Sequence, residues 1–251
     1  MTSRPTVLVF AGADPSGGAG IAADILAIAA QGAHALPVIT ALTVQDNDRV
    51  YEVLPVDSAV VRRQALALMD KVAIHAVKIG IPGNRANAEA IAELVGQLRL
   101  NQPDLPVVLD PVLASGAGDA LTRADALAPL LPLATLVVPN LPEADALAAG
   151  LRGEVLVTGG HAIGDSVVNC WTGAGGRREW RWPRLPGEFH GSGCTLASAI
   201  AARLACGDSM EQALVTAQYY CHQALEESFS IAGGQRIPLR FPSTFTFQGA
   251  P

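Results

Sequence analysis

The chain has 251 residues, half of them apolar and 16% charged, with a formal net charge of −6. This length and apolar content suffice for a sizeable core and exclude an intrinsically disordered chain. The acidic balance and the absence of a basic stripe in the sequence argue against a nucleic-acid-binding protein. No stretch approaches the ~20 consecutive apolar residues of a membrane span.

The four cysteines have no CxxC spacing, which argues against a zinc site and favours a reducing compartment. The apolar run Val7–Ala11 is short and leads directly into a glycine-rich loop, so we interpret it as a first core strand and not as a signal peptide. We therefore expect a cytoplasmic protein.

Strand-like apolar runs alternate with segments of helical periodicity along the whole chain. In the first half, the predicted strands are Thr6–Ala11, Pro37–Val44, Val50–Leu54, Ala76–Ile79 and Val107–Asp110, and the predicted helices are Ala19–Gln31, Ser58–Val72 and Asn87–Leu98. In the second half, the predicted strands are Leu136–Val138, Glu154–Thr158, Val167–Trp171 and Glu179–Trp182. The last two alternate in polarity, which favours an antiparallel edge.

Two helices are predicted to close the chain. The segment Thr195–Cys206 is small and apolar nearly all round, so we expect it to be buried. The next helix begins at Ser209 with Gln212 three residues later, which is a capping-box pattern.

This alternation predicts a single α/β domain over residues 1–251, with a mainly parallel sheet covered by helices on both faces. Ligands of such sheets bind outside the carboxyl ends of the strands. The residues just after each predicted strand are therefore the candidates for chemistry: Gly12, Asp14, Gln45, Gly80, Ile81, Asp110, Pro111, Asn140–Glu143 and Gly159–His161.

The strongest motif is His190-Gly191-Ser192-Gly193-Cys194-Thr195, at the start of the predicted buried helix. Glycines let backbone N–H groups approach a ligand, and the first amides of a helix have no internal partner. Together with the helix dipole they predict an anion hole. Cys194 falls in the first turn, where we expect a lowered thiol pKa. The alternative is a tight turn with a buried, inert cysteine.

A second glycine-rich segment, Gly12–Gly20, joins the first strand to the first helix. It is not a Walker A loop, because no Gly-Lys-Ser/Thr follows. Gly18-Ala19-Gly20-Ile21-Ala22-Ala23 matches a dinucleotide fingerprint, but it lies several residues beyond the strand end. A substrate-binding loop is therefore favoured over a dinucleotide site, and a surface turn is the third alternative.

Five polar residues are further candidates, and two of them admit two interpretations each. Asp24 is either a solvated helix residue or a pocket residue. Gln45 either contacts the edge of a heteroaromatic ring or caps the sheet. Asn140 is a candidate N-cap. Glu143 and Asp110 are candidate ligands of Mg²⁺, in part through water.

Taken together, the motifs of this chain closely resemble those of hydroxymethylpyrimidine/phosphomethylpyrimidine kinases in the ribokinase-like superfamily. The likeness runs from about Val7 to the last helix. The motifs that carry it are Gly12–Gly20, Ile39–Gln45, Lys78–Gly80, Asp110–Val112, Pro139–Ala144, Gly159–His161 and His190–Leu196.

The resemblance implies a three-layer ribokinase-like fold, ATP and Mg²⁺ as cofactors, and a homodimer. It implies phosphorylation of the hydroxymethyl group of the pyrimidine precursor of thiamin, and then of the monophosphate. By the same resemblance, the pyrimidine pocket comprises Gly12, Asp24, Gln45, Ile81 and Val112, the anion hole comprises Gly191, Ser192, Gly193 and Cys194, and the magnesium–nucleotide site comprises Asp110, Asn140, Glu143, Thr158 and Gly160.

Two departures from the family pattern concern the phosphates. Thr158 and the segment Ala114–Gly116 stand where members often carry lysine. The negative charge of the phosphates must then be met by amides, Mg²⁺ and an arginine, which disfavours the second phosphorylation relative to the first. Ile81, often Met in the family, is a milder change.

The leading hypothesis is phosphoryl transfer by positioning and charge stabilisation, with the Cys194 thiolate as the proton acceptor. A pyridoxal kinase of the same fold is the nearest alternative. A nicotinamide-dependent oxidoreductase and a non-catalytic ligand sensor are the alternatives from other classes. A cysteine hydrolase is disfavoured, because no histidine is clearly paired with Cys194.

Overall fold

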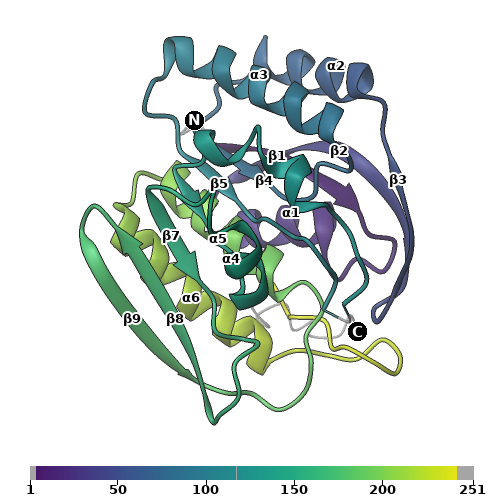
Figure 1. Cartoon of the computed structure of the whole chain (residues 1–251), viewed down its shortest axis with the longest axis vertical. Coiled ribbons are helices and arrows are strands. Elements are labelled where there is room, and N and C mark those ends of the chain that lie inside the picture. The colour runs from purple at the N-terminus through teal and green to yellow at the C-terminus, as the bar shows by residue number, and fades with distance from the viewer. Residues whose placement is uncertain (1–3, 117, 242–251) are drawn as a thin grey trace, which may run out of the picture.

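The computed structural model describes residues 4–116 and 118–241. Within these residues, nine strands form one mixed sheet in the order β3-β2-β1-β4-β5-β6-β7-β8-β9 (Figure 1). The strands are β1 (Thr6–Ala13), β2 (His34–Gln45), β3 (Val50–Pro55), β4 (Ala76–Ile79), β5 (Val107–Leu109), β6 (Leu136–Val137), β7 (Glu154–Val157), β8 (Ser166–Gly173) and β9 (Gly176–Pro183).

Six neighbouring strands, from β2 through β1 to β7, run parallel, and three strands at the two edges are antiparallel. At one edge β3 pairs with β2, and at the other β8 and β9 extend the sheet beyond β7. The predicted antiparallel edge is therefore confirmed. The parallel strands all end at the same rim of the sheet, which places the loops after them side by side.

Helices cover both faces of the sheet. One face is covered by α1 (Gly20–Ala30), α5 (Ser192–Ala205) and α6 (Met210–Glu226), and the other by α2 (Ser58–Met69), α3 (Arg85–Asn101), α4 (Leu141–Leu147) and the 3₁₀ turns η1 (Ala124–Leu127) and η2 (Leu131–Leu133). The two faces of β1 show why both must be covered. Val7 and Val9 contribute to one hydrophobic cluster, and Leu8 and Phe10 to the other.

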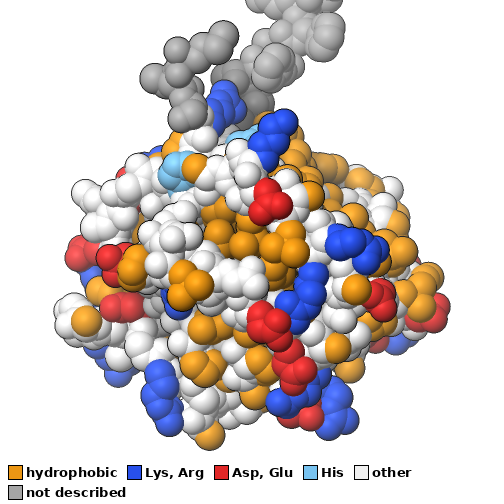
Figure 2. Space-filling view, turned by 90° about the horizontal axis from the view of Figure 1, so that it is seen from above, with side chains coloured by type: hydrophobic (Ala, Val, Ile, Leu, Met, Phe, Trp, Pro, Cys, Tyr) orange, Lys and Arg blue, Asp and Glu red, His pale blue; other side chains and the backbone are white. Residues whose placement is uncertain are grey.

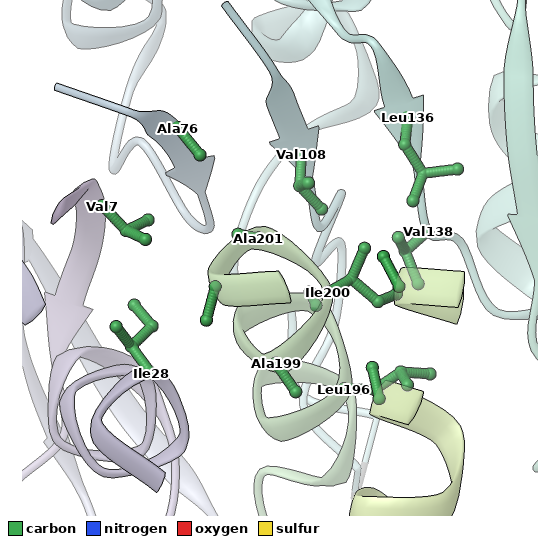
Figure 3. Packing of buried hydrophobic residues seen from close by; sticks show 14 of the residues in the cluster. Val7, Ile28, Ala76, Val108, Leu136, Val138, Leu196, Ala199, Ile200 and Ala201 are labelled. Atoms are coloured by element: carbon green, nitrogen blue, oxygen red, sulfur yellow. The ribbon is translucent and has the colours of Figure 1, made fainter. Parts of the chain in front are cut away.

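Helix α5 is the central element of its layer. Ile200 and its neighbours on this helix point toward β1, β4, β5 and β6, where they meet Val7, Ala76, Val108 and Leu136 (Figure 3). The predicted burial of this helix is confirmed, and small residues let it approach the sheet closely. The Ser209–Gln212 capping box that was predicted for α6 is also present.

In the part of the chain that the structure describes, no helix is long and apolar enough to cross a bilayer. Figure 2 shows the face on which α2 and α3 lie in Figure 1, and there acidic and basic side chains are interspersed. On this face the described residues form no extended basic patch.

Candidate functional site

A cavity of about 590 Å³ lies at the rim where the parallel strands end. It collects residues from β1 near one end of the chain to α6 and Gln235 near the other. All but one of the site residues assigned through the family resemblance line it: Gly12, Gln45, Ile81, Asp110, Val112, Asn140, Glu143, Thr158, Gly160, Gly191, Ser192, Gly193 and Cys194. The exception is Asp24.

The glycine-rich segment Gly12–Gly20, here called the first glycine loop, is ordered around the carboxylate of Asp14. This carboxylate accepts hydrogen bonds from the backbone N–H groups of Ser16 and Ala19, at 2.8 and 2.7 Å. His190 Nε2 lies 2.8 Å from the same carboxylate. It links Asp14 to the segment His190–Gly191, here called the second glycine loop. Burial alone raises the pKa of an acid, but the hydrogen bonds from His190, Gln45, Ser16 and Ala19 lower the pKa of Asp14 to about 2.

The second glycine loop ends at the N-cap of α5, Gly191, which has φ +80°. A side chain here is strained, and its Cβ would overlap the Gly18 carbonyl oxygen. The helix therefore begins at Ser192, three residues before the predicted start. The first amides of α5 have no intrahelical partners, and residues 191–194 line the cavity. The predicted anion hole is thus exposed to a cavity and not enclosed in the core.

The structure corrects the prediction for Asp24. Its side chain is fully buried beneath the cavity and accepts from Lys78 Nζ at 2.9 and 3.1 Å and from the Ser198 hydroxyl at 2.7 Å. Lys78 Nζ also lies 3.5 Å from Asp110 Oδ2. Asp24 is therefore an ion-pair partner of Lys78 and is not among the residues that line the cavity.

Lys78 is the central cation of the site, and sequence reasoning gave it no role. Burial by itself lowers the pKa of an amine, but the nearby carboxylates of Asp24 and Asp110 raise the pKa of Lys78 above its usual range. The ammonium group therefore stays charged although it is fully buried. The signal in the sequence was a lysine inside the apolar strand 76–79, where a charge is retained only if it is paired.

The prediction of a lowered pKa for Cys194 was wrong. Burial raises the pKa of this thiol to about 12, the carboxylates of Asp110 and Asp24 add to the effect, and Lys78 opposes it. The helix N-terminus favours a thiolate, but two carboxylates and poor solvation outweigh it here. Cys194 is therefore a thiol at neutral pH, with part of its surface exposed at the cavity.

Asp110, directly after β5, and Glu143, in the first turn of α4, both line the cavity. Both carboxylate oxygens of Glu143 accept backbone hydrogen bonds, from Asn140 at 2.9 Å and from Leu113 at 3.2 Å. Asn140 and Glu143 form a capping box at the start of α4, as the N-cap interpretation of Asn140 predicted. Burial and the charge of Asp110 raise the pKa of Glu143 to about 7.

Asp110 has the freer carboxylate of the two. Its buried Oδ2 makes no hydrogen bond, and burial raises the pKa of the group against the opposing charge of Lys78. Among the described residues, no three His, Cys, Asp or Glu side chains converge on one point. The protein thus offers a magnesium ion one or two carboxylates, which fits an ion held mainly by substrate phosphates.

The far end of the cavity was not predicted. It is formed by β8, β9 and α6, where Trp182 donates to Gln218 Oε1 at 3.2 Å and Asn169 donates to the same oxygen at 2.9 Å. The rings of Trp182 and His222 lie 5.1 Å apart between centroids. Asn169 also accepts from the Gly159 N–H, which ties this end to the Gly159–His161 turn.

Comparison with known proteins agrees with this geometry. The family model described as phosphomethylpyrimidine kinase matches residues 14–152 and 147–239. A hydroxymethylpyrimidine/phosphomethylpyrimidine kinase of Streptomyces coelicolor is 38% identical, over 92% of this chain and 92% of its own length. This chain belongs to the phosphomethylpyrimidine kinase family.

Solved structures show the same architecture. A phosphomethylpyrimidine kinase of Clostridium difficile superposes with a TM-score of 0.74 at 28% identity, over 88% of this chain and all of its own. A Bacillus subtilis pyridoxal kinase bound to ADP superposes with a TM-score of 0.82 at 26% identity, over 94% of this chain and 97% of its own. The ribokinase-like fold is confirmed. The kinase interpretation is accordingly favoured over the oxidoreductase that the GxGxxA match suggested.

Proposed function

We propose that this protein transfers the γ-phosphate of ATP to 4-amino-5-hydroxymethyl-2-methylpyrimidine, in thiamin biosynthesis, as one kinase domain. Its family membership supports this activity. The observation that carries the proposal is the position of the α5 amides and Cys194 in the same cavity as Gly12 and Gln45. An anion hole beside a ring-sized pocket is what transfer of a phosphoryl group to a heteroaromatic alcohol requires.

The acceptor occupies the end of the cavity formed by the strands β1, β2 and β4. There, the Ile81 side chain packs directly against Gly12, where a Cβ would lie 2.6 Å from Ile81 Cδ1, and forms one apolar wall. Val112 supplies a second apolar wall, and the Gln45 amide meets the polar edge of the ring. An uncharged pyrimidine fits this mixture of apolar walls and one amide.

The nucleotide occupies the remainder of the cavity. The Gly160 amide and the Thr158 hydroxyl face the phosphates, and the Trp182–His222 pair contacts the base. Asp110 is the group that would hold Mg²⁺, with Glu143 acting through water because its oxygens are already hydrogen-bonded. When bound, the ion neutralises phosphate charge.

Cys194 accepts the proton as the alcohol oxygen attacks phosphorus. Since Cys194 is a thiol in the free enzyme, its own proton passes to solvent in the cavity, where part of the side chain is exposed. The net change is that the alcohol loses one proton to solvent, the bond between the γ-phosphorus and ADP breaks, and a bond from the alcohol oxygen to that phosphorus forms. Such a late proton transfer suits a loose transition state, in which positioning and charge stabilisation contribute most.

Phosphorylation of the monophosphate is part of the proposed activity, at a lower efficiency. Position 158 is Thr and residues 114–116 include no lysine, so neither place offers a lysine to balance the negative charge of the monophosphate. Lys78 is already paired with Asp24 and Asp110. We therefore expect a lower kcat/KM for the second transfer than for the first.

Pyridoxal is the second candidate acceptor. The similarity to a pyridoxal kinase of Bacillus subtilis over nearly the whole chain favours it. The two rings differ only in a few contacts at Gln45, Ile81 and Val112. Discrimination between the two alcohols then depends on differences of about 1–3 kcal/mol.

A coupled assay of ADP release tests the function with hydroxymethylpyrimidine, its monophosphate and pyridoxal in parallel. The proposal expects the highest kcat/KM with the pyrimidine alcohol. Replacing Cys194 with Ala should lower kcat by about 100-fold or more while KM for the alcohol changes little. A C194A enzyme with normal kcat removes Cys194 from the mechanism, and no turnover with any of the three acceptors refutes the kinase activity.

A homodimer in the cytoplasm completes the proposal. Leu42, Val44 and Leu54 are exposed apolar side chains on the paired strands β2 and β3, a face suited to burial against a second copy. The four cysteines are unpaired, as expected in a reducing compartment. Sedimentation of the wild type and a Leu42→Glu, Leu54→Glu variant tests the dimer, since the variant should sediment as a monomer.

A further inference from the structure

A buried guanidinium lies directly behind the N-terminus of α5. It belongs to Arg240, which follows the last helix and is 2% exposed. Its Nη2 donates to the Gly18 carbonyl at 2.6 Å and lies 3.4 Å from the Gly191 carbonyl oxygen. Its Nε donates to the Thr195 hydroxyl at 2.9 Å. Arg240 thus joins the first glycine loop, the second glycine loop and the first turn of α5.

The charge of Arg240 has no carboxylate partner among the described residues. Its hydrogen-bond acceptors there are two carbonyl groups and one hydroxyl. The carboxylate of Asp24, which also influences Arg240, is already bonded to Lys78 and Ser198. Burial lowers the pKa of Arg240, yet a guanidinium remains charged in proteins. A buried cation is costly unless an anion compensates it, so the site favours a negatively charged ligand nearby.

Arg240 also supports the direction of the first peptide of α5, whose Gly191 carbonyl accepts the intrahelical hydrogen bond from the Thr195 N–H at 2.9 Å. The Gly191 carbonyl accepts from the Thr195 hydroxyl at 2.7 Å and faces the guanidinium. In a planar trans peptide the N–H group points opposite to the carbonyl, so the Ser192 N–H points away from Arg240. Ser192 lines the cavity, and the amide therefore faces the position of a bound phosphate.

We propose that Arg240 is a positioning residue for phosphoryl transfer, which orients the amides of the anion hole and provides positive charge behind them. This inference rests on the proposed function and extends it. Charge that is fixed before the reaction begins stabilises a transition state without a cost of reorganisation. Arg240 supplies positive charge to balance the phosphates. Thr158 is uncharged, and Lys78 is already paired with Asp24, so neither provides it. It acts through the first peptide of α5 and does not itself line the cavity.

The test compares Arg240→Gln and Arg240→Lys in the full-length enzyme. Arg99→Gln is the matched control, because Arg99 also bonds one carbonyl, of Leu105, and one hydroxyl, of Thr135, at the opposite rim of the sheet. Steady-state rates are measured with hydroxymethylpyrimidine at saturating ATP and Mg²⁺. Binding of inorganic triphosphate and thermal unfolding are measured for every variant.

We expect R240Q to lower kcat by about 100-fold while KM for the alcohol changes less than about threefold. Triphosphate should bind about tenfold more weakly to R240Q. R240K, which keeps the charge, should retain about tenfold more activity than R240Q. R99Q should keep kcat within about threefold of wild type, whatever its melting temperature.

Equal kcat values for R240K and R240Q would overturn the proposal, because the effect would then be one of packing and not of charge. A kcat of R240Q within about threefold of wild type would do the same. If R240Q does not fold, R240K decides alone. It should bind triphosphate as wild type does and lose about tenfold in kcat, and an undiminished kcat contradicts the orienting role.

Failure of the proposed function is a separate outcome. If the wild type phosphorylates neither the pyrimidine nor pyridoxal, the kinase activity is refuted. The triphosphate measurement still tests Arg240, since anion binding at α5 needs no acceptor. In that case, equal triphosphate affinity of wild type and R240Q overturns the role of Arg240 as well.

Discussion

Replacing Lys78 with Met removes the cation shared by two buried carboxylates. Met has a similar length and no charge, so the strand β4 keeps its packing. Asp24 retains only the hydroxyl of Ser198, and Asp110 retains no cation within 4 Å among the described residues. We therefore expect a large loss of stability from a change that creates almost no cavity.

The magnitude follows from the two N–O distances. At an effective dielectric constant near 20, opposite charges 2.9 and 3.5 Å apart attract by about 6 and 5 kcal/mol. Burying the ammonium group costs several kcal/mol, which Met does not incur. The difference leaves a net loss of about 3–5 kcal/mol in the free energy of unfolding, the usual range when one partner of a buried ion pair is removed.

Urea unfolding at pH 5 and pH 7.5 measures this loss, with Lys71→Met as the control, because Lys71 is the only other lysine and is exposed. Removal of Lys78 raises the pKa of Asp110 in the folded state further above its unfolded value. An acid with a raised folded pKa loses stability as pH rises from the unfolded to the folded value. The deficit of K78M should therefore be larger at pH 7.5 than at pH 5. A deficit below about 1 kcal/mol, equal at both pH values, would refute the assigned ion pairs.

Three further outcomes are expected. The pKa of Glu143 is raised to about 7, so the wild type loses stability between about pH 4.5 and pH 7, and Glu143→Gln does not. Urea unfolding should therefore show that the stability of E143Q rises relative to wild type over that range. A difference in stability that is independent of pH contradicts the raised pKa. Gly191→Ala should lower the free energy of unfolding by about 1–3 kcal/mol and reduce kcat, because φ is +80° and the added Cβ meets Gly18; an unchanged melting temperature would be inconsistent with this backbone geometry. Trp182→Leu should raise KM for ATP about tenfold and leave KM for the alcohol unchanged. Trp180 lies outside the cavity, so Trp180→Leu should leave KM for ATP unchanged as well. Equal effects of the two substitutions on KM for ATP would remove Trp182 from the nucleotide site.

The sequence predicts the sheet and the rim on which the site lies. Buried strands such as 76–79 and 107–109 are short apolar runs, and the residues after them are restricted to one edge by the parallel topology. Boundaries are less accurate. The helix α5 begins at Ser192 and not at Thr195, since a glycine in the left-handed region can serve as its N-cap.

Contacts between distant residues were not predictable in the same way. The pairing of Asp24 with Lys78 joins α1 to β4, and no local pattern encodes which helix face meets which strand. The error on Cys194 has the same origin. Its position at a helix start was visible in the sequence, but the carboxylates of Asp24 and Asp110, which raise its pKa, come from elsewhere in the chain. Trp182 was assigned to the sheet edge, and its second contact, with α6, depends on the tertiary fold.

The central position of α5 affects how the chain emerges from the ribosome. The sheet face that carries Val7, Ala76 and Val108 is covered by a helix that ends at residue 205 (Figure 3). At about 5–20 residues per second, translation needs roughly 10–40 s to reach that point after β1 has been made. During this interval the nascent sheet presents an unprotected apolar surface to solvent. Early folding of this protein is therefore expected to depend on chaperones that shield such surfaces, and ribosome stalling before α5 should increase its aggregation.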